Sequence, residues 1–365
     1  MNLQHGLLEQ LEEAVAQKDI RYRAETLRRV TDLFLAGAGT FSSEQLALFD
    51  DVLGRLIEEI DLAARAAFGA RLAVTAAPPP RIMRDLALDD AIEVAGPVLA
   101  QSAALDEATL VETASSKSQQ HLLAISRRAS LPQAVTDVLV VRGDREVAVS
   151  TAANDGAEFS EFGYAKLVQR AGRDGELALV VWVRPEVPRE HLLAMFAQAS
   201  EAVRLRLEAA GGGKGGTLHE VVAQASMRLQ AGMREGSSTY ASARTRVLAL
   251  RQAGRLDEAA LATFASEGRF DETTIALSFM ADLPIGLIER AITNRKTEQI
   301  LVLAKAIGLG WDSARELLLL QAGVNGSSTP ELDQCCATFA RLQQDTARKA
   351  LQFYRLRERA AATEY

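Results

Sequence analysis

The sequence predicts an all-α protein whose central part is a stacked α-solenoid. Apolar residues recur at helical spacing through nearly every segment of the chain. Helix pairs recur about every 25–30 residues. The segments that begin at Asp144 and Asp174 share one frame, in which Val147 and Leu177 stand at the same offset. Because one pair cannot bury its own apolar face, each pair needs neighbours, and a stack follows.

Residues 1–76 are expected to form an N-terminal helical bundle. Leu3–Ala16 and Ile20–Leu35 have helical spacing, and Ser42 and Ser43 can cap a third helix that runs toward Phe68. The three prolines at 78–80 then interrupt helical structure and stiffen the connection to the next part.

Residues 81–209 are expected to form the solenoid. Helices are predicted for Gln119–Arg128, from Pro132 to Arg142, from Asp144, for Phe159–Ala171, from Asp174 and from Pro188.

Three runs in this part also fit strands, because they are rich in β-branched residues: Val138–Val141, Val147–Val149 and Leu179–Val183. Helix is preferred, since each run lies in a longer pattern with a helix-start residue before it. We expect all three to be buried helical turns.

Residues 210–216 are expected to be a flexible linker, since five of the six residues Gly211–Gly216 are glycine. The stretch superficially resembles a phosphate-binding loop. However, Lys214 is followed by glycine rather than Ser or Thr, and a helix precedes it.

Residues 217–365 are expected to form a C-terminal helical domain with repeat-like helix pairs. Gly254–Ala262 is echoed by Gly268–Ala276. Each first glycine is expected to end a helix, and Asp257 and Asp271 to cap the next one. A single long helix is expected at the end, roughly Glu331–Ala361.

Composition predicts a cytoplasmic protein. The net charge of -7 gives no broad attraction to nucleic acid or anionic lipid. The only cysteines, Cys335 and Cys336, are adjacent, so no disulfide framework exists and a reducing compartment fits. The longest apolar run, Leu177–Val183, is much shorter than the ~20 residues that cross a bilayer. Aromatic residues make up only 5% of the chain, which favours closely packed helices.

No catalytic, cofactor-binding or metal-binding residue is predicted. The four histidines lack metal-ligand spacing and are interpreted as residues on helix shoulders: His5, His121, His191 and His219. Cys335 and Cys336 lie on the apolar seam of the last helix, which favours buried packing over a nucleophile.

Arginines at the ends of the central helices are the candidate partner-binding residues: Arg127, Arg128, Arg142, Arg145, Arg170 and Arg173. In a regular stack they would form a row of guanidinium groups that can grip carboxylates or phosphates. The alternative is that they complement helix C-termini and pair with local aspartates. The aspartates of this region are interpreted as caps and inter-repeat partners: Asp89, Asp90, Asp137, Asp144 and Asp174.

Several short stretches resemble one bacterial family. They are Leu27–Phe34, Phe49–Leu53, Val94–Ser102, Val135–Leu139 and Phe270–Thr273. Together they are similar to a mainly alphaproteobacterial family of proteins with a domain of unknown function, and the likeness covers nearly the whole chain. The central repeats also resemble HEAT-like and leucine-rich-variant helical repeats. The resemblance implies an all-helical architecture and no particular reaction.

The leading hypothesis is a non-enzymatic scaffold or adaptor that binds another macromolecule, a protein, in a regulatory role. A homo-oligomer through the C-terminal helix is also considered. The alternative is a nucleotide- or nucleic-acid-acting protein on a HEAT-like scaffold, although Trp182 and Trp311 lie outside the basic clusters that such a protein would want. A third reading is a signalling protein that binds a small nucleotide between its halves.

Overall fold

A computed structural model describes the backbone of residues 20–37, 40–58, 60–209, 228–326 and 330–363. Its contacts divide the chain into two compact units, residues 1–163 and 164–365. The helix expected at Leu3–Ala16, the linker at 210–216 and the segment 217–227 lie outside the described residues. Within the described ranges every regular element is a helix, which confirms the predicted all-α class.

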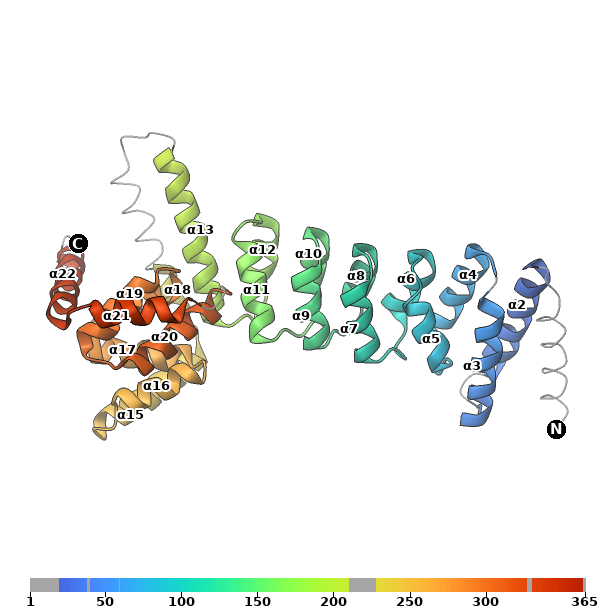
Figure 1. The fold of residues 1–365 in the computed structure, drawn as a ribbon, viewed down its shortest axis with the longest axis horizontal. Helices are drawn as coiled ribbons and strands as arrows, with labels where there is room; N and C mark the ends of the chain where they lie inside the picture. Colours follow the sequence, from blue (N-terminus) through green and yellow to red (C-terminus); the bar gives the residue numbers. More distant parts are fainter. Residues whose placement is uncertain (1–19, 38–39, 59, 210–227, 327–329, 364–365) are drawn as a thin grey trace. The chain divides into compact units, whose positions relative to one another are not determined.

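The first unit is a helical repeat in two layers (Figure 1). One layer is formed by α3, α5, α7 and α9, in which each helix packs against the next, and the other by α4, α6, α8 and α10. Their bounds are Ser43–Ile57 (α3), Leu62–Ala73 (α4), Pro80–Ala87 (α5), Ile92–Gln101 (α6), Glu107–Ser116 (α7), Gln119–Ser126 (α8), Gln133–Arg142 (α9) and Arg145–Ala153 (α10). α2, Ile20–Ala36, packs against α3 and α4 at the start.

Local signals in the sequence fix where these helices begin. Ser42 and Gln45 form a capping box at α3, and Asp106 and Asp144 cap α7 and α10 with their carboxylates. Pro80 is the first residue of α5, where its missing N–H costs nothing. The starts predicted near Pro132 and Asp144 are confirmed.

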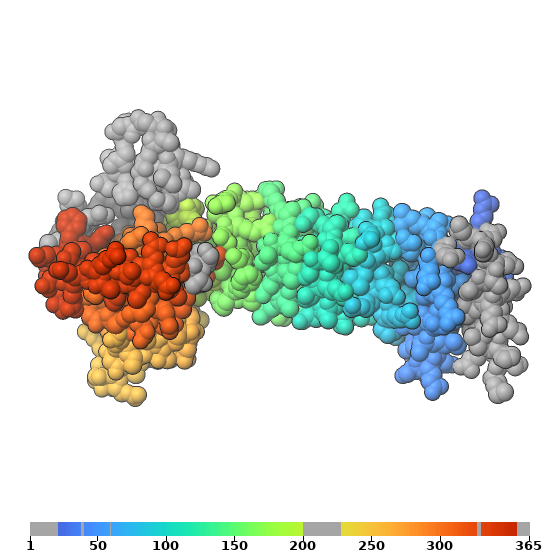
Figure 2. Space-filling model, viewed as in Figure 1, coloured from blue at the N-terminus to red at the C-terminus, as the bar shows by residue number. Residues whose placement is uncertain are grey.

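Leucine side chains such as Leu99, Leu122 and Leu139 fill the interior between the layers and are fully buried. Figure 2 shows a closed outer surface over the successive helix pairs of this unit. Because each pair shares its apolar interior with its neighbours, a single pair is not expected to fold alone.

The second unit begins within α11, Glu161–Ala171, and contains a further set of helices. They are α12 (Gly175–Val183), α13 (Arg189–Ala209), α15 (Ser238–Gln252), α16 (Glu258–Ser266), α17 (Phe270–Ala281), α18 (Ile285–Thr293), α19 (Thr297–Ile307), α20 (Trp311–Val324), α21 (Leu332–Arg341) and α22 (Gln344–Thr363). α17 packs against α15, α16, α18 and α19, and most of its residues are buried. None of the helices described here or in the first unit combines the length and apolarity needed to cross a bilayer.

For the repeated motif at Gly254–Ala262 and Gly268–Ala276, the two predicted helix ends are confirmed and one of the two predicted caps is wrong. Gly254 and Gly268 both have left-handed backbone, with φ of 67° and 70°, and each follows a helix end. Asp257 caps α16 as predicted. Asp271 does not cap α17, because that helix begins one residue earlier, at Phe270, and the Asp271 side chain is drawn into a buried ion-pair cluster.

The single long C-terminal helix predicted for Glu331–Ala361 is wrong. The chain leaves helical geometry at Leu342, whose ψ is 121°, and α21 and α22 lie on either side. Both segments pack against α19. Phe339 of α21 packs against Trp311, and Leu351 of α22 is also buried.

Candidate functional site

Two of the predicted arginines join successive repeats of the first unit. Arg128 donates from Nη1 to the Leu99 carbonyl at 2.6 Å and from Nη2 to the Ser102 carbonyl at 2.7 Å, at the C-terminal end of α6. Arg142 donates to the Ala114 carbonyl near the end of α7. Both guanidinium groups therefore satisfy carbonyls that a helix end leaves without intrahelical partners, where its dipole also favours a cation.

A neutral side chain performs the same task at the next joint. Asn154 donates from Nδ2 to the carbonyls of Ser126 and Arg128, at 2.9 Å and 2.6 Å, at the end of α8. The Gln119 side chain bonds the turn between α9 and α10 as both donor and acceptor. It donates to the Arg142 carbonyl and accepts from the Asp144 N–H. Capping of one helix pair by the next is thus the recurring polar contact of the repeat.

The six arginines do not share one role. Arg128 and Arg142 donate to carbonyl oxygens of another repeat. Arg142 is nevertheless exposed, as are Arg127 and Arg145 of the same unit. Arg170 and Arg173 belong to the second unit, whereas the other four belong to the first. Binding of a partner by this set stays a prediction.

The aspartates of the repeat have the structural roles expected of them. Asp89 pairs with Arg65 at 2.7 Å, and Asp90 pairs with Lys117 at 2.5 Å, which lowers the pKa of the Asp90 carboxyl. Asp137 accepts from the Ser160 hydroxyl at 2.7 Å. Asp144 and Asp174 are N-caps.

Two histidines lie deeper than predicted. His121 and His191 are 1% and 2% exposed, so they are interior residues rather than shoulder residues. His121 bonds the Ser118 hydroxyl and the Asp89 carbonyl, and His191 bonds the Val324 carbonyl. Each histidine therefore ties one helix start to another segment of its own unit.

The cysteines are half-buried rather than fully packed away. Burial, followed by the nearby Glu298 and Glu331, raises the pKa of the Cys335 thiol. A raised pKa keeps the thiol protonated and weakly nucleophilic. Among the described residues no group of His, Cys, Asp and Glu side chains has an arrangement that could hold a metal ion.

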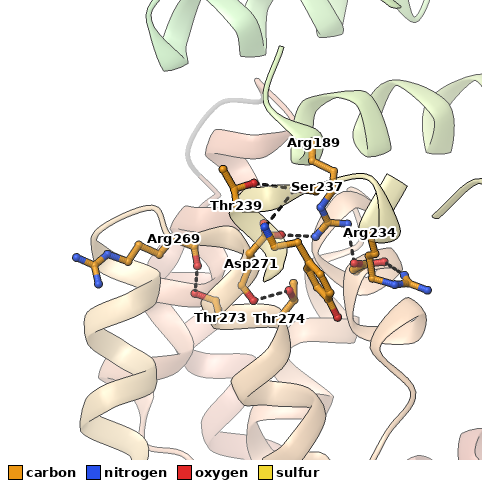
Figure 3. Close-up of polar contacts among 10 residues, drawn as sticks. Arg189, Arg234, Ser237, Thr239, Arg269, Asp271, Thr273 and Thr274 are labelled. Carbon is orange, nitrogen blue, oxygen red and sulfur yellow. Dashed lines mark hydrogen bonds and ion pairs between the residues drawn. The ribbon is translucent and has the colours of Figure 1, made fainter. Parts of the chain in front are cut away.

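A buried ion-pair cluster in the second unit was not predicted (Figure 3). Arg189, the first residue of α13, donates to Glu289 of α18 at 2.7 Å and to Asp271 of α17. Arg234 donates to the other oxygen of Glu289 at 2.6 Å. The Arg189 guanidinium also lies 5.1 Å from the ring centroid of Tyr240.

The charges of this cluster balance, because two arginines face two carboxylates. Burial disfavours the charged form of Arg189, but Asp271 and Glu289 outweigh that effect and raise its pKa. Burial also raises the pKa of Tyr240. The cluster consequently fastens α13 to α17 and α18 rather than offering a charge to a ligand. One sequence signal points toward it: a cation at the start of a helix opposes the macrodipole, so Arg189 is expected to have a carboxylate partner, although no local pattern identifies which one.

An exposed apolar face lies on α12. Leu179, Trp182 and Val183 are 69%, 39% and 74% exposed, while Leu177 and Val181 on the other side are buried. The prediction that Leu179–Val183 is helical is confirmed, but the prediction that it is a buried turn is wrong. The periodicity did not separate the two faces, because both are apolar.

Comparison with known proteins finds one family. The family model described as an uncharacterised protein conserved in bacteria (DUF2336) matches residues 94–352. Neither the curated proteins nor the solved structures give a match.

Proposed function

We propose that this chain, which belongs to the bacterial DUF2336 family, is a non-enzymatic adaptor that binds another protein in a regulatory role. The observation that carries the proposal is the two-layer repeat of the first unit. Stacks of this kind, of which HEAT-like repeats are one form, present long surfaces that usually hold another macromolecule. The proposal places the protein in the cytoplasm.

The hydrogen-bond and ion-pair partners of these polar side chains favour this proposal over a catalytic role. Arg128, Arg142 and Asn154 bond backbone carbonyls, and Arg189 bonds Asp271 and Glu289. Groups used in this way hold helices together and do not converge on a substrate. The exposed apolar residues of α12 are, by contrast, of the type that protein interfaces bury.

Affinity purification of the full-length chain from its own bacterium tests the proposal. The eluate is treated with nuclease and analysed by quantitative mass spectrometry. We expect one protein to be enriched at near-stoichiometric amount and to survive the nuclease. Enrichment of no protein over a strain in which the chain carries no affinity tag contradicts the proposal.

The alternative function makes a different prediction in a thermal-shift screen. A nucleotide- or nucleic-acid-acting protein gains stability from its ligand as RT ln(1 + [L]/Kd), about 2.7 kcal/mol at a hundredfold excess over Kd. The adaptor should show no shift with nucleoside triphosphates, cyclic dinucleotides or short single-stranded nucleic acid. A saturable shift with any of them contradicts the adaptor function.

A further inference from the structure

The serine before α8 does not use its side chain as a helix cap. Ser118 is the N-cap of α8, a position where a serine hydroxyl ordinarily accepts a hydrogen bond from one of the first N–H groups of the helix. Its hydroxyl makes no such bond and lies instead 2.8 Å from Nδ1 of His121. The N–H groups of Gln119 and Gln120 consequently have no hydrogen-bond partner among the described residues.

The Asp89 carbonyl determines which nitrogen of the His121 ring is basic. Nε2 of His121 lies 2.9 Å from this carbonyl oxygen. Because a carbonyl oxygen can only accept, Nε2 carries the hydrogen, and in the neutral ring the lone pair is left on Nδ1. The Ser118 hydroxyl therefore donates to Nδ1. His121 is only 1% exposed, so the surrounding helices hold the ring in this orientation.

These contacts supply the three parts of an activated serine nucleophile. Such a nucleophile needs a hydroxyl, a histidine that takes its proton and a group that orients the histidine. Ser118, His121 and the Asp89 carbonyl provide them in that order. Ser118 is exposed, so a reagent can reach the hydroxyl while the imidazole behind it stays buried.

The start of α8 can stabilise the charge that such a nucleophile creates. Attack of a hydroxyl on an acyl carbon places negative charge on the acyl oxygen, and N–H groups are its usual partners. The free N–H groups of Gln119 and Gln120 directly follow the serine, at the positive end of the helix macrodipole. The neighbouring ammonium group of Lys117 is engaged by Asp90 at 2.5 Å.

We propose that Ser118 is a covalent modification site that takes an acyl group from an activated ester or thioester, with His121 as the general base. The hydroxyl oxygen attacks the acyl carbon while its proton passes to Nδ1 of His121. The bond to the leaving group then breaks, and the same proton passes to the departing alkoxide or thiolate. The products are a serine ester and a free alcohol or thiol. This site goes beyond the adaptor function and does not depend on it.

Acetylation of the full-length chain with p-nitrophenyl acetate tests the site. The reaction is stopped at short times, and peptide mass spectrometry follows acetylation at each serine. Ser116 is the internal control, because it is also exposed but its hydroxyl donates to the Glu112 carbonyl and has no base. A general base accelerates a reaction about 10²–10⁴-fold. We expect Ser118 to be acetylated at least about a hundredfold faster than Ser116.

Three variants separate the action of His121 from mere exposure of the serine. His121→Gln can keep a donor for the Asp89 carbonyl but has no basic nitrogen, so acetylation of Ser118 should slow about a hundredfold or more. Ser118→Ala should remove the fast release of p-nitrophenol, and Ser116→Ala should leave it unchanged. Circular dichroism establishes that each variant is folded.

Equal rates at Ser118 and Ser116 in the unmodified chain overturn the proposal. A folded His121→Gln chain that keeps the fast rate at Ser118 overturns it as well, because the hydroxyl would then react without the base. If His121→Gln does not fold, the comparison of the two serines in the unmodified chain decides. An affinity purification that recovers no protein contradicts the adaptor function alone, whereas a slow Ser118 contradicts the modification site alone.

Discussion

Replacing Arg128 with Ala should destabilise the first unit, because this side chain joins two repeats. Two charge-assisted hydrogen bonds, to the carbonyls of Leu99 and Ser102, are lost. Such bonds contribute about 1.5–3 kcal/mol each. The Arg128 Nε is buried with no hydrogen-bond partner among the described residues, which already costs about 1–3 kcal/mol and offsets part of the gain. The free energy of unfolding should therefore fall by about 2–3 kcal/mol.

Urea unfolding of the full-length chain, followed by circular dichroism, measures this loss. A destabilisation of that size should also lower the melting temperature of the first unit by about 5–10 °C. Arg127→Ala is the matched control, since Arg127 is the preceding residue and is exposed; it should change stability by less than about 0.5 kcal/mol. Arg128→Lys should recover less than half of the loss, because one ammonium group cannot reproduce the guanidinium fork. If Arg128→Ala and Arg127→Ala unfold alike, the guanidinium does not hold the repeats together.

Three further predictions concern the second unit. Glu289→Gln should lower the free energy of unfolding by about 3–5 kcal/mol, because it leaves the buried Arg189 short of a counter-charge. Thermal unfolding measures this loss, and Glu235→Gln, which changes an exposed carboxylate, should leave the stability nearly unchanged. Gly326→Ala should lower stability by more than about 1 kcal/mol, because Gly326 has a φ of 59° and a Cβ there would lie 2.3 Å from the Ala165 oxygen. Gly323→Ala, which meets open space inside α20, should be neutral or stabilising, and equal effects of the two substitutions would refute the close approach. In a Cys336→Ser background, Cys335 should react with iodoacetamide at pH 8 more slowly than a cysteine in a short peptide, because its raised pKa keeps the thiol protonated. The reaction rate should rise as the pH is increased. A reaction faster than that of the peptide would contradict the argument that burial raises the pKa.

The sequence was sufficient for features that depend on neighbouring residues. Asp144 and Asp174 mark helix starts because their carboxylates bond N–H groups two or three residues later. Gly254 and Gly268 mark helix ends because glycine, which has no Cβ, adopts the left-handed turn without steric cost. The same local rules distinguished helix from strand in the three β-branched runs.

Features that depend on distant contacts escaped prediction. Arg189 and Glu289 are 100 positions apart, and no local pattern links them. Asp271 resembles the capping Asp257 in sequence, yet its partner comes from α13, so the internal echo was misleading there. The exposed side of α12 could not be recognised from periodicity, because both of its sides are apolar.

For the predicted row of arginines, the sequence pattern was visible but its role was not. Their recurrence along the chain is real, but recurrence alone cannot distinguish a binding surface from a joint between repeats. Arg128 and Arg142 hydrogen-bond backbone carbonyls of the preceding repeat, and Asn154 makes the same kind of contact without a charge. A test of partner binding by reversing two of these charges, Arg142→Glu together with Arg145→Glu, would consequently also lower the stability of the first unit, because Arg142 bonds the Ala114 carbonyl.

Native mass spectrometry of the endogenous protein tests the adaptor function most directly. The chain alone has a mass of 39.4 kDa. The adaptor function predicts a complex that is heavier by the mass of a different polypeptide and that releases the intact chain on collisional activation. A species at the mass of the chain alone, at an integer multiple of it, or heavier only by a nucleotide or nucleic acid would contradict the function proposed here.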